Sequence, residues 1–372
     1  MEKNRHRVWA EIDLRAIEEN YKAICAAAKS PVLCVVKANA YGHGAVRVAQ
    51  LLASCGAPYF AVATVQEAVE LRENGIETPI LNLGYIDEND MDTVVRQHIT
   101  ASVYDRETAE LLSAAAVSAG EEATVHYKLD TGMTRLGFPA WEKEETVQAV
   151  LAASRLPGLR SEGIFTHFAV ADTLDGQAYT AMQYERFDEI CAALAANGLE
   201  LPLRHCANSG AIQQYAETHC TMTRAGIILY GYSPDPALPR PIKLRPAMTV
   251  KARVVQVRDI PAHTSVSYGR AFETEEAIRM AVVAMGYADG YLRTGSGKAH
   301  VLLAGQLTPV LGRICMDMCM ARVPDGAPVS RGDEAVIFGP SGLTADDVAE
   351  AAGTISYEVM CAISRRVPRI YF

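Results

Sequence analysis

Pro31-Val-Leu-Cys-Val-Val-Lys37-Ala-Asn-Ala-Tyr41-Gly-His-Gly44 is the stretch from which the fold can be worked out. Its apolar, largely β-branched first half predicts a strand that is buried on both faces, as in a parallel sheet. A lysine at the end of such a strand is expected to be paired, desolvated or chemically used, because burying a free ammonium costs several kcal/mol. Desolvation would make the Lys37 amine a nucleophile for carbonyl compounds. The alternative is a lysine that extends to solvent. Gly42-His43-Gly44 suits a flexible loop that approaches an anion.

Similar apolar segments recur along the first 230 residues and alternate with helical patterns. Candidate strands lie near 32–37, 59–64, 79–83, 99–104, 123–129, 161–167, 202–207 and 221–224. Helical periodicity covers 14–30, 66–74, 107–119 and 179–197. Eight such βα units predict a parallel (β/α)8 TIM-like barrel over residues 14–233. A doubly wound open sheet is the competing topology, but no G-x-G-x-x-G motif follows any of these strands.

The pattern changes after a proline-rich segment, residues 233–241, which marks a domain edge. Residues 248–258 alternate between apolar and polar side chains and predict a half-buried antiparallel strand. Further strand patterns lie near 280–285, 299–303, 307–311, 319–323 and 334–338. Residues 234–372 are therefore expected to form a mostly β domain.

Composition excludes several classes of protein. A net charge of −9 gives no basic surface for nucleic acid or for an anionic membrane. No apolar run reaches the roughly 18 residues that span a bilayer, and the charged residues 1–7 lead into Val8 without the apolar region of a signal peptide. The nine cysteines show no C-x-x-C spacing and indicate reduced thiols in a cytoplasmic protein. Cys315 and Cys319 have no nearby partners that would complete a zinc set, so no metal site is expected.

Polar residues gather at the predicted carboxyl ends of the barrel strands, where such barrels carry their active sites. These residues are Lys37, Lys128, His167, Asn208, Ser209, Arg224 and Gly226. Phosphate commonly binds after strands seven and eight, and Ser209 and Gly226-Ile227 offer a hydroxyl and accessible backbone amides there. The alternative for Ser209 is the N-cap of a helix that starts near Ala211, and both roles are compatible.

Nine motifs in order along the chain resemble those of the alanine racemases, the fold-type III enzymes that use pyridoxal 5'-phosphate. They are Val35-Val-Lys37-Ala-Asn-Ala-Tyr41-Gly-His-Gly44, Lys128-Leu-Asp-Thr-Gly-Met-Thr-Arg135, Thr166-His167-Phe-Ala169, Asn208-Ser-Gly210, Arg224-Ala-Gly226-Ile227, Val266-Ser-Tyr268-Gly-Arg270, Gly286-Tyr-Ala-Asp-Gly-Tyr291, Gly312-Arg-Ile-Cys-Met316-Asp317 and Ile355-Ser-Tyr357-Glu-Val359. The resemblance implies that a short strand at residues 9–13 joins the C-terminal domain, so that residues 1–13 belong with 234–372.

The resemblance also implies two catalytic bases. Lys37 would bind the cofactor covalently, and its freed amine would serve one face of the substrate Cα, the face from which D-alanine loses its proton. Racemisation needs a second base on the opposite face, and the motif assigns it to Tyr268. A phenol is normally too weak an acid for this work, so nearby positive charge is expected. Without the motif, Tyr268 would be interpreted as a half-buried strand aromatic.

Further cofactor contacts follow from the same resemblance. Arg224 would face the pyridine nitrogen and, because arginine keeps its proton, leave that nitrogen unprotonated, which limits side reactions. His167 would link Arg224 to the catalytic tyrosine, although a structural role is the default for a histidine at a strand end. Tyr41 and Tyr357 would donate hydroxyls to the phosphate. The remaining cofactor-binding residues would be Asn208, Ser209, Gly226 and Ile227.

The substrate contacts come from two regions. Arg135 would bind the substrate carboxylate or the cofactor's phenolic oxygen, the alternative being a surface salt bridge. Lys128 matches a lysine that is N-carboxylated in many relatives, a change that turns a cation into an anion able to position Arg135. Met316, through its backbone N–H, and Asp317 would form a wall of the site, whereas a methionine is otherwise ordinary core filling. The resemblance places Tyr268, Met316 and Asp317 in the partner subunit's site, which makes a head-to-tail homodimer.

The expected function is the interconversion of L-alanine and D-alanine, which supplies D-alanine for peptidoglycan. The alternatives are a racemase for serine, a decarboxylase of the same fold type and a non-catalytic protein that binds pyridoxal 5'-phosphate. Such decarboxylases place an acidic residue at the pyridine nitrogen, and Arg224 argues against them. The non-catalytic class is a lone barrel, so the long region after Gly231 and the presence of Tyr268 argue against it.

Overall fold

The computed structural model describes residues 6–372, which divide into two compact units. The first, the barrel unit, comprises residues 18–40 and 45–244. The second, the β unit, comprises the described residues up to 17 together with 41–44 and 245–372. The first five residues of the predicted 1–13 segment lie outside the described residues.

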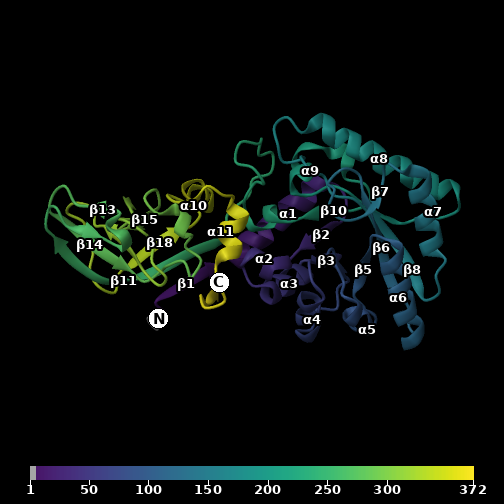
Figure 1. Ribbon diagram of the computed structural model, residues 1–372, viewed down its shortest axis with the longest axis horizontal. Helices are drawn as coiled ribbons and strands as arrows, with labels where there is room; N and C mark the ends of the chain where they lie inside the picture. The colour runs from purple at the N-terminus through teal and green to yellow at the C-terminus, as the bar shows by residue number, and fades with distance from the viewer. Residues whose placement is uncertain (1–5) are drawn as a thin grey trace. The chain divides into compact units, whose positions relative to one another are not determined.

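Within the described residues, the sheet of the barrel unit has nine parallel strands. Eight follow one another in the order β10-β2-β3-β4-β5-β6-β8-β9, and the short β7, Phe138–Pro139, pairs beside β6 (Figure 1). Their bounds are β2 Val32–Val35, β3 Tyr59–Val62, β4 Ile80–Asn82, β5 Thr100–Val103, β6 Ala123–Asp130, β8 Leu159–Phe165, β9 Leu203–His205 and β10 Thr223–Ala225. The two ends of this order approach each other, because the Arg224 N–H donates to the Ala207 carbonyl just beyond β9 at 3.0 Å. The sheet is thus a nearly closed barrel, and the predicted TIM-like fold is confirmed.

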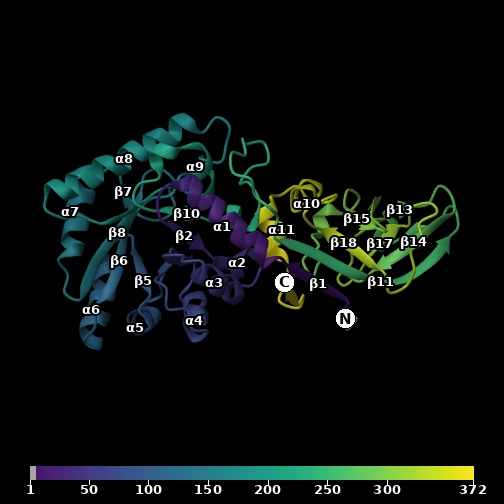
Figure 2. The same cartoon turned by 180° about the vertical axis from the view of Figure 1, so that it is seen from behind.

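Helices lie outside these strands in both views of the barrel unit (Figures 1 and 2). Their bounds are α1 Leu14–Ala28, α3 Ala45–Ser54, α4 Val65–Glu73, α5 Met91–Arg96, α6 Arg106–Ala119, α7 Lys143–Ser154, α8 Gln177–Ala196 and α9 Ser209–Gln214. Local chemistry sets their ends: Thr64 caps α4 by accepting from Glu67 N–H, and Asp105 caps α6 by accepting from Thr108 N–H. No helix within residues 6–372 is both long and apolar enough to cross a membrane.

The β unit is built on the long strand β11, Met248–Ile260 (Figure 2). Strands follow one another in the order β16-β15-β18-β11-β1-β19, while β14 pairs with β11 and β17 with β14. Their bounds are β1 Val8–Ile12, β14 Ile278–Val283, β15 His300–Leu303, β16 Gln306–Pro309, β17 Cys319–Arg322, β18 Glu334–Phe338 and β19 Arg369–Tyr371. The mostly β C-terminal domain is therefore confirmed, and β1 pairs with β11 in it. Two helices were not predicted, α10 Ala345–Ala352 and α11 Ser356–Ala362.

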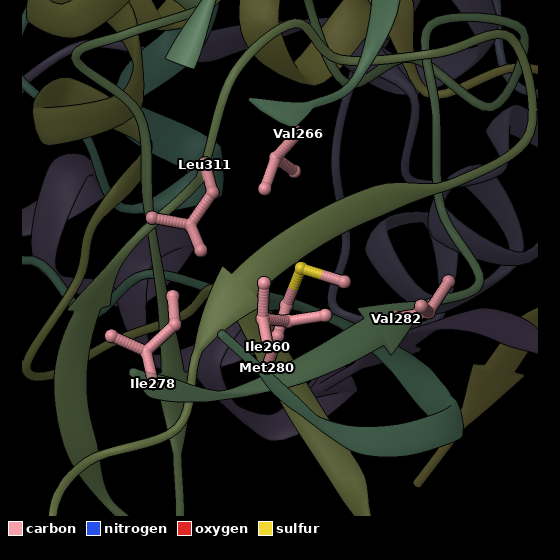
Figure 3. Close-up of a cluster of buried hydrophobic side chains, with 6 residues drawn as sticks. All are labelled: Ile260, Val266, Ile278, Met280, Val282 and Leu311. Atoms are coloured by element: carbon pink, nitrogen blue, oxygen red, sulfur yellow. The ribbon is translucent and has the colours of Figure 1, made fainter. Parts of the chain in front are cut away.

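A cluster of buried apolar side chains fills the part of the β unit around β14 (Figure 3). Its members are Ile260, Val266, Ile278, Met280, Val282 and Leu311. Val266 ends the short strand β12, Ser265–Val266, which pairs with β13, Phe272–Glu273. Because Val266 is buried in this cluster, it anchors the chain directly before Ser267 and Tyr268.

Candidate active site

Lys37 lies two residues beyond β2, in a short turn of left-handed helix labelled α2, Lys37–Tyr41. Ala38, Asn39 and Ala40 have φ of 52°, 54° and 53° with ψ of 48°, 46° and 51°. Residues with a Cβ pay roughly 1–2 kcal/mol each for this conformation. Lys37 is thus not the last residue of the strand, as predicted, but the first residue of a strained turn. Such strain is typical of functional sites.

Side chains from neighbouring segments hold this turn in place. The Glu67 carboxylate accepts from the Ala38 N–H at 2.6 Å and from the Ala63 N–H at 2.8 Å. The Asn39 side chain accepts from the Ala45 N–H at 2.9 Å. These bonds tie the turn to α4 and α3, so that the direction of the partly buried Lys37 is determined by its surroundings.

The two glycines after the turn, Gly42 and Gly44, both have positive φ. Gly42 has φ +82°, and a Cβ there would collide with the Met360 carbonyl. Gly44 has φ +98°, and a Cβ there would collide with the Tyr371 hydroxyl. These contacts explain the two glycines by packing, and the approach of Gly42-His43-Gly44 to an anion stays a prediction. The glycines are needed because this segment packs tightly against other residues of the β unit.

Arg224 is the most completely bound side chain at the carboxyl end of the barrel, with an exposure of 3%. Its two terminal nitrogens donate to the carbonyls of Thr166 at 2.7 Å, His205 at 2.7 Å and Cys206 at 3.0 Å. They also donate to the Nδ1 atoms of His205 at 3.0 Å and His167 at 3.2 Å. Burial lowers the pKa of Arg224 to about 10, so the guanidinium keeps its charge at neutral pH. Among the described residues, its Nε–H makes none of these bonds and can face a ligand.

A chain of hydrogen bonds runs from Arg224 to Glu162. Because arginine only donates, His205 Nδ1 must accept, and a neutral His205 then carries its proton on Nε2. His205 Nε2 lies 2.9 Å from His126 Nδ1, and His126 Nε2 lies 3.1 Å from Glu162 Oε2. The bond from His126, with help from Tyr59, lowers the pKa of Glu162 to about 2. Burial keeps the pKa of both histidines below the ordinary value. Each hydrogen bond in this series is thus donated in the direction of the Glu162 carboxylate.

Cationic groups gather around His167 and Lys128. Burial holds the pKa of His167 well below its usual value, and the charges of Arg224, Arg135, Lys37 and Lys128 lower it further. Burial also lowers the pKa of Lys128 to about 8, with further effects from the charges of Arg135, Arg224 and Lys37 and an opposing one from Asp130. Lys128 is 5% exposed. This concentration of positive charge is suited to an anionic ligand.

The loops after β9 and β10 meet at a small polar pair. The Gly226 N–H donates to Ser209 Oγ at 2.9 Å, which leaves the Ser209 O–H free to donate elsewhere. The N-cap of α9 is Asn208, whose side chain accepts from the Ala211 N–H at 3.0 Å. The alternative that made Ser209 the cap is therefore wrong. Ser209 is instead a buried first residue of the helix, joined to the loop that begins η3, Ile227–Tyr230.

Buried Gln183 on α8 joins the loops after β6 and β8. Its amide donates to Thr131 Oγ1 and to the His167 carbonyl, both at 3.2 Å, and it accepts from the Ala169 N–H at 2.9 Å. Beyond Thr131 the chain reaches Arg135, which is exposed and forms no ion pair within residues 6–372. The surface salt bridge considered for Arg135 is thus absent there.

Tyr268, Met316 and Asp317 lie on interlocked loops of the β unit. The Ser267 hydroxyl donates to the Arg313 carbonyl at 2.6 Å, which joins the Tyr268 loop to the segment that carries Met316. N–H groups of Tyr287 and Ala288 donate to the carbonyls of Cys315 and Met316, each at 3.0 Å. Asp317 accepts from Arg366 at 2.6 Å. These backbones are fixed, yet the Tyr268 and Met316 side chains are 68% and 53% exposed.

Tyr41 and Tyr357 are neighbours within the β unit, with ring centroids 5.8 Å apart. Tyr41 is buried, and burial raises the pKa of its phenol, which therefore stays protonated and able to donate. Tyr357 is carried by α11, one of the two helices that were not predicted.

Several residues that support the site were not predicted from the sequence. They are Glu67, His126, Glu162, Gln183 and His205. One of them could have been found: His126 lies two residues before Lys128 on the same strand, so the two side chains share a face of it. The others are brought to the site by strands and helices that are distant in sequence.

Comparisons with known proteins fit this arrangement. Residues 12–234 match the family model of the alanine racemase N-terminal domain, and residues 247–371 match that of the C-terminal domain. An alanine racemase of Desulfovibrio desulfuricans is 46% identical over 98% of both chains, and one of Methanococcus maripaludis is 43% identical over 98% of this chain and 99% of the relative. The solved alanine racemase of Clostridium difficile 630 has a TM-score of 0.95 at 40% identity and covers 100% of this chain and 97% of its own.

Proposed function

The chain belongs to the alanine racemase family and catalyses the interconversion of L-alanine and D-alanine, and we propose that Lys37 and Tyr268 move the proton. Inversion at Cα requires that a proton leave one face and another arrive on the opposite face. An amine and a phenol on opposite sides of the substrate meet this need without any rotation of the substrate.

We propose pyridoxal 5'-phosphate as the cofactor, because the residues of the barrel unit fit its chemistry. The cations around His167 suit its negative charge, and Ser209 with Gly226 and Ile227 offers a hydroxyl and backbone amides to its phosphate. When bound, the cofactor supplies an electron-withdrawing ring that makes the substrate's α-proton acidic. Lys37 would hold it covalently. The other phosphate-binding residues would be Asn208, Tyr41 and Tyr357.

Arg224 would orient the ring through its Nε–H. The terminal nitrogens are occupied by carbonyls and histidines, so the remaining N–H is the group that is free to meet the ring nitrogen. Because Arg224 cannot give up its proton at neutral pH, it would leave that nitrogen as a hydrogen-bond acceptor. This limits electron withdrawal and so favours racemisation over side reactions. His167 accepts from Arg224 through Nδ1, which leaves its Nε2–H to donate toward the catalytic phenol.

Lys128 would support Arg135 as an N-carboxylated lysine. Carbon dioxide adds only to a neutral amine, and a pKa of about 8 gives Lys128 a substantial neutral fraction near neutral pH. The product is an anion, which relieves the repulsion among the neighbouring cations and can pair with Arg135. Arg135 would then hold the substrate carboxylate.

The active site would be completed by a second copy of the chain. Tyr268 and Met316 present exposed side chains on a fixed backbone, which suits contact with another subunit. In a homodimer, Tyr268, Met316 and Asp317 of one subunit would meet Lys37 of the other. Met316 would bind substrate through its N–H, with Asp317 beside it.

We further propose that the enzyme works in the cytoplasm and provides D-alanine for peptidoglycan synthesis. The nine free cysteines favour this location.

The cation cluster around His167 carries the cofactor proposal, and borohydride reduction of the protein mixed with pyridoxal 5'-phosphate tests it. Peptide mapping should find the pyridoxyl label on Lys37, and Lys37→Ala should lose it. A label on Lys128 would overturn the assignment. Circular dichroism of L-alanine and L-serine incubated with the enzyme follows the reaction itself, with serine expected to racemise roughly 10²-fold less efficiently because an apolar pocket rejects an added hydroxyl only modestly.

A further inference from the structure

Two thiols of the barrel unit, one directly after β9 and one shortly before β10, lie in contact. Cys206 Sγ and Cys220 Sγ are 3.5 Å apart, and Cys206 Sγ also lies 3.0 Å from the Thr218 carbonyl. Cys206 follows β9 and is buried, whereas Cys220 precedes β10 and is partly exposed. The sulfur atoms need to approach by only about 1.5 Å to reach the length of a disulfide bond.

The surroundings of Cys220 favour its thiolate form. The hydrogen bond from Cys206 lowers the pKa of Cys220, and the charge of Arg204 and a bond from Tyr184 act in the same direction. Burial and Asp188 oppose them. Burial holds the pKa of Cys206 well above its usual value, so this thiol keeps its proton, which it can donate to the Thr218 carbonyl or to Cys220. Nearby Cys191, with a pKa raised by burial to about 12, also stays protonated.

This pair has the features of a reversible oxidation site: two thiols in contact, one of them accessible to a small oxidant, with surroundings that lower the pKa of the accessible thiol. We propose that Cys206 and Cys220 form a dithiol that a hydroperoxide oxidises to an intramolecular disulfide, and that this disulfide slows the enzyme. Cys220 attacks one peroxide oxygen, the O–O bond breaks and hydroxide leaves as water, giving a sulfenic acid. Cys206 then attacks the Cys220 sulfur, the S–O bond breaks and a second water leaves. Two thiols and one hydrogen peroxide thus become one disulfide and two waters.

The dithiol is coupled to the site through Cys206. Its carbonyl accepts from Arg224 at 3.0 Å, and the preceding His205 accepts from Arg224 twice. Asn208 and Ser209 follow Cys206 by two and three residues. Drawing the Cys206 sulfur toward Cys220 shifts this support of Arg224. The effect on turnover rests on the proposed role of Arg224, whereas formation of the disulfide does not.

The test treats the reduced holoenzyme with hydrogen peroxide, alkylates the remaining thiols and maps the peptides by mass spectrometry. The expected result is loss of two alkylatable thiols and one linked peptide pair containing Cys206 and Cys220. Turnover should fall several-fold and return on addition of dithiothreitol. Cys206→Ser should instead accumulate a sulfenic acid at Cys220 that dimedone traps. First oxidation at another cysteine, or at Cys220 without a disulfide in the parent, would overturn the proposed site.

Matched variants separate the two parts of the proposal. Cys220→Ser and Cys220→Ala alter a partly exposed position and should neither form the linked peptide nor lose turnover under peroxide. Cys55→Ser removes a partly buried thiol on the turn after α3 and should behave as the parent does. A disulfide between Cys206 and Cys220 that leaves turnover unchanged would overturn the coupling through Arg224.

Discussion

The surroundings of Arg224 in the barrel unit and of Tyr268 in the β unit hold these two candidate site residues in opposite ways. Arg224 is 3% exposed, and its terminal nitrogens donate to five acceptors within its own unit. The Tyr268 side chain is 68% exposed, and its hydroxyl has no hydrogen-bond partner in the part of the chain that the structure describes. The Arg224 side chain is thus held by residues of its own unit, whereas around Tyr268 the β unit holds the backbone but not the side chain.

Lys37 and Tyr268 therefore depend on different surroundings. On the barrel side, the strained turn after Lys37 is held by hydrogen bonds to Glu67 and Asn39, and the cations around His167 come from the same unit. On the tyrosine side, the apolar cluster anchors Val266 and the loops interlock, but Tyr268 itself is 68% exposed. Tyr268 would therefore become a base only when another surface provides positive charge around it.

The largest effect is expected from Tyr268→Phe, which distinguishes proton transfer by Tyr268 from proton transfer by Lys37. We expect turnover to fall by about 10³-fold, within the range of general acid–base catalysis, while the cofactor stays bound. In deuterated solvent the variant should still exchange the α-proton of D-alanine, which faces Lys37, but not that of L-alanine. Proton NMR of each enantiomer measures this. Equal loss of exchange from both enantiomers would favour a single base.

A second experiment tests whether the tyrosine comes from another copy of the chain. Lys37→Ala and Tyr268→Phe should each be nearly inactive alone. Mixing them under conditions that exchange subunits should restore about a quarter of the parent activity, because half of the dimers then contain one intact site of two. Activity is measured before and after exchange, and each variant mixed with itself is the control. No recovery despite proven exchange would place both bases in one chain.

Ser209→Ala tests the barrel side at its phosphate loops. The change removes a hydroxyl expected to donate to a phosphate and leaves the Gly226 N–H without its acceptor. Hydrogen bonds to charged groups contribute about 1.5–3 kcal/mol, so the affinity for pyridoxal 5'-phosphate should fall roughly ten- to a hundredfold. Equilibrium dialysis measures it. Ser154→Ala, at the end of α7, is the control and should bind as the parent does. Unchanged affinity of Ser209→Ala would remove Ser209 from the phosphate site.

The smallest effect is expected from Glu162→Gln, which keeps an acceptor for His126 but removes the charge. The pKa of Glu162 is lowered from 4.5 to about 2 in the folded protein. Its ionised form therefore stabilises the fold above about pH 4.5, and this stabilisation is lost as the pH falls toward 2. The free energy of unfolding at pH 7 should drop by about 1–3 kcal/mol, with the gap narrowing in acid.

Urea unfolding of the cofactor-free protein at several pH values measures this gap. Glu122→Gln, at an exposed position, is the matched control and should leave the stability unchanged. A constant difference between pH 7 and pH 4 and below would show that the charge of Glu162 is not what stabilises the chain of histidines.

Much of the fold could be predicted because its signals are local. Each predicted barrel strand overlaps an observed one, since runs such as Val32–Val35 are buried on both faces and need no distant information. The residues that support the site could not be predicted in this way. Glu162 and His126 act through a contact between neighbouring strands, and Gln183 acts from a helix. The left-handed turn of Ala38, Asn39 and Ala40 could not be predicted either. It depends on hydrogen bonds of the Glu67 and Asn39 side chains that exist only in the folded protein.

Three features follow from the amino-acid sequence alone: the alternation of strands and helices, the change to a β-rich region after the proline-rich segment, and the motif residues that point to the alanine racemase family. Hydrophobic periodicity and side-chain chemistry are properties of short stretches, so they can be read without coordinates. Only the tertiary structure decided which groups share a charge environment. The lowered pKa of Lys128, the one-way chain from Arg224 to Glu162 and the contact of Cys206 with Cys220 all depend on distances between residues far apart in sequence. Electrostatic and hydrogen-bond energies fall off steeply with distance, and folding alone fixes those distances.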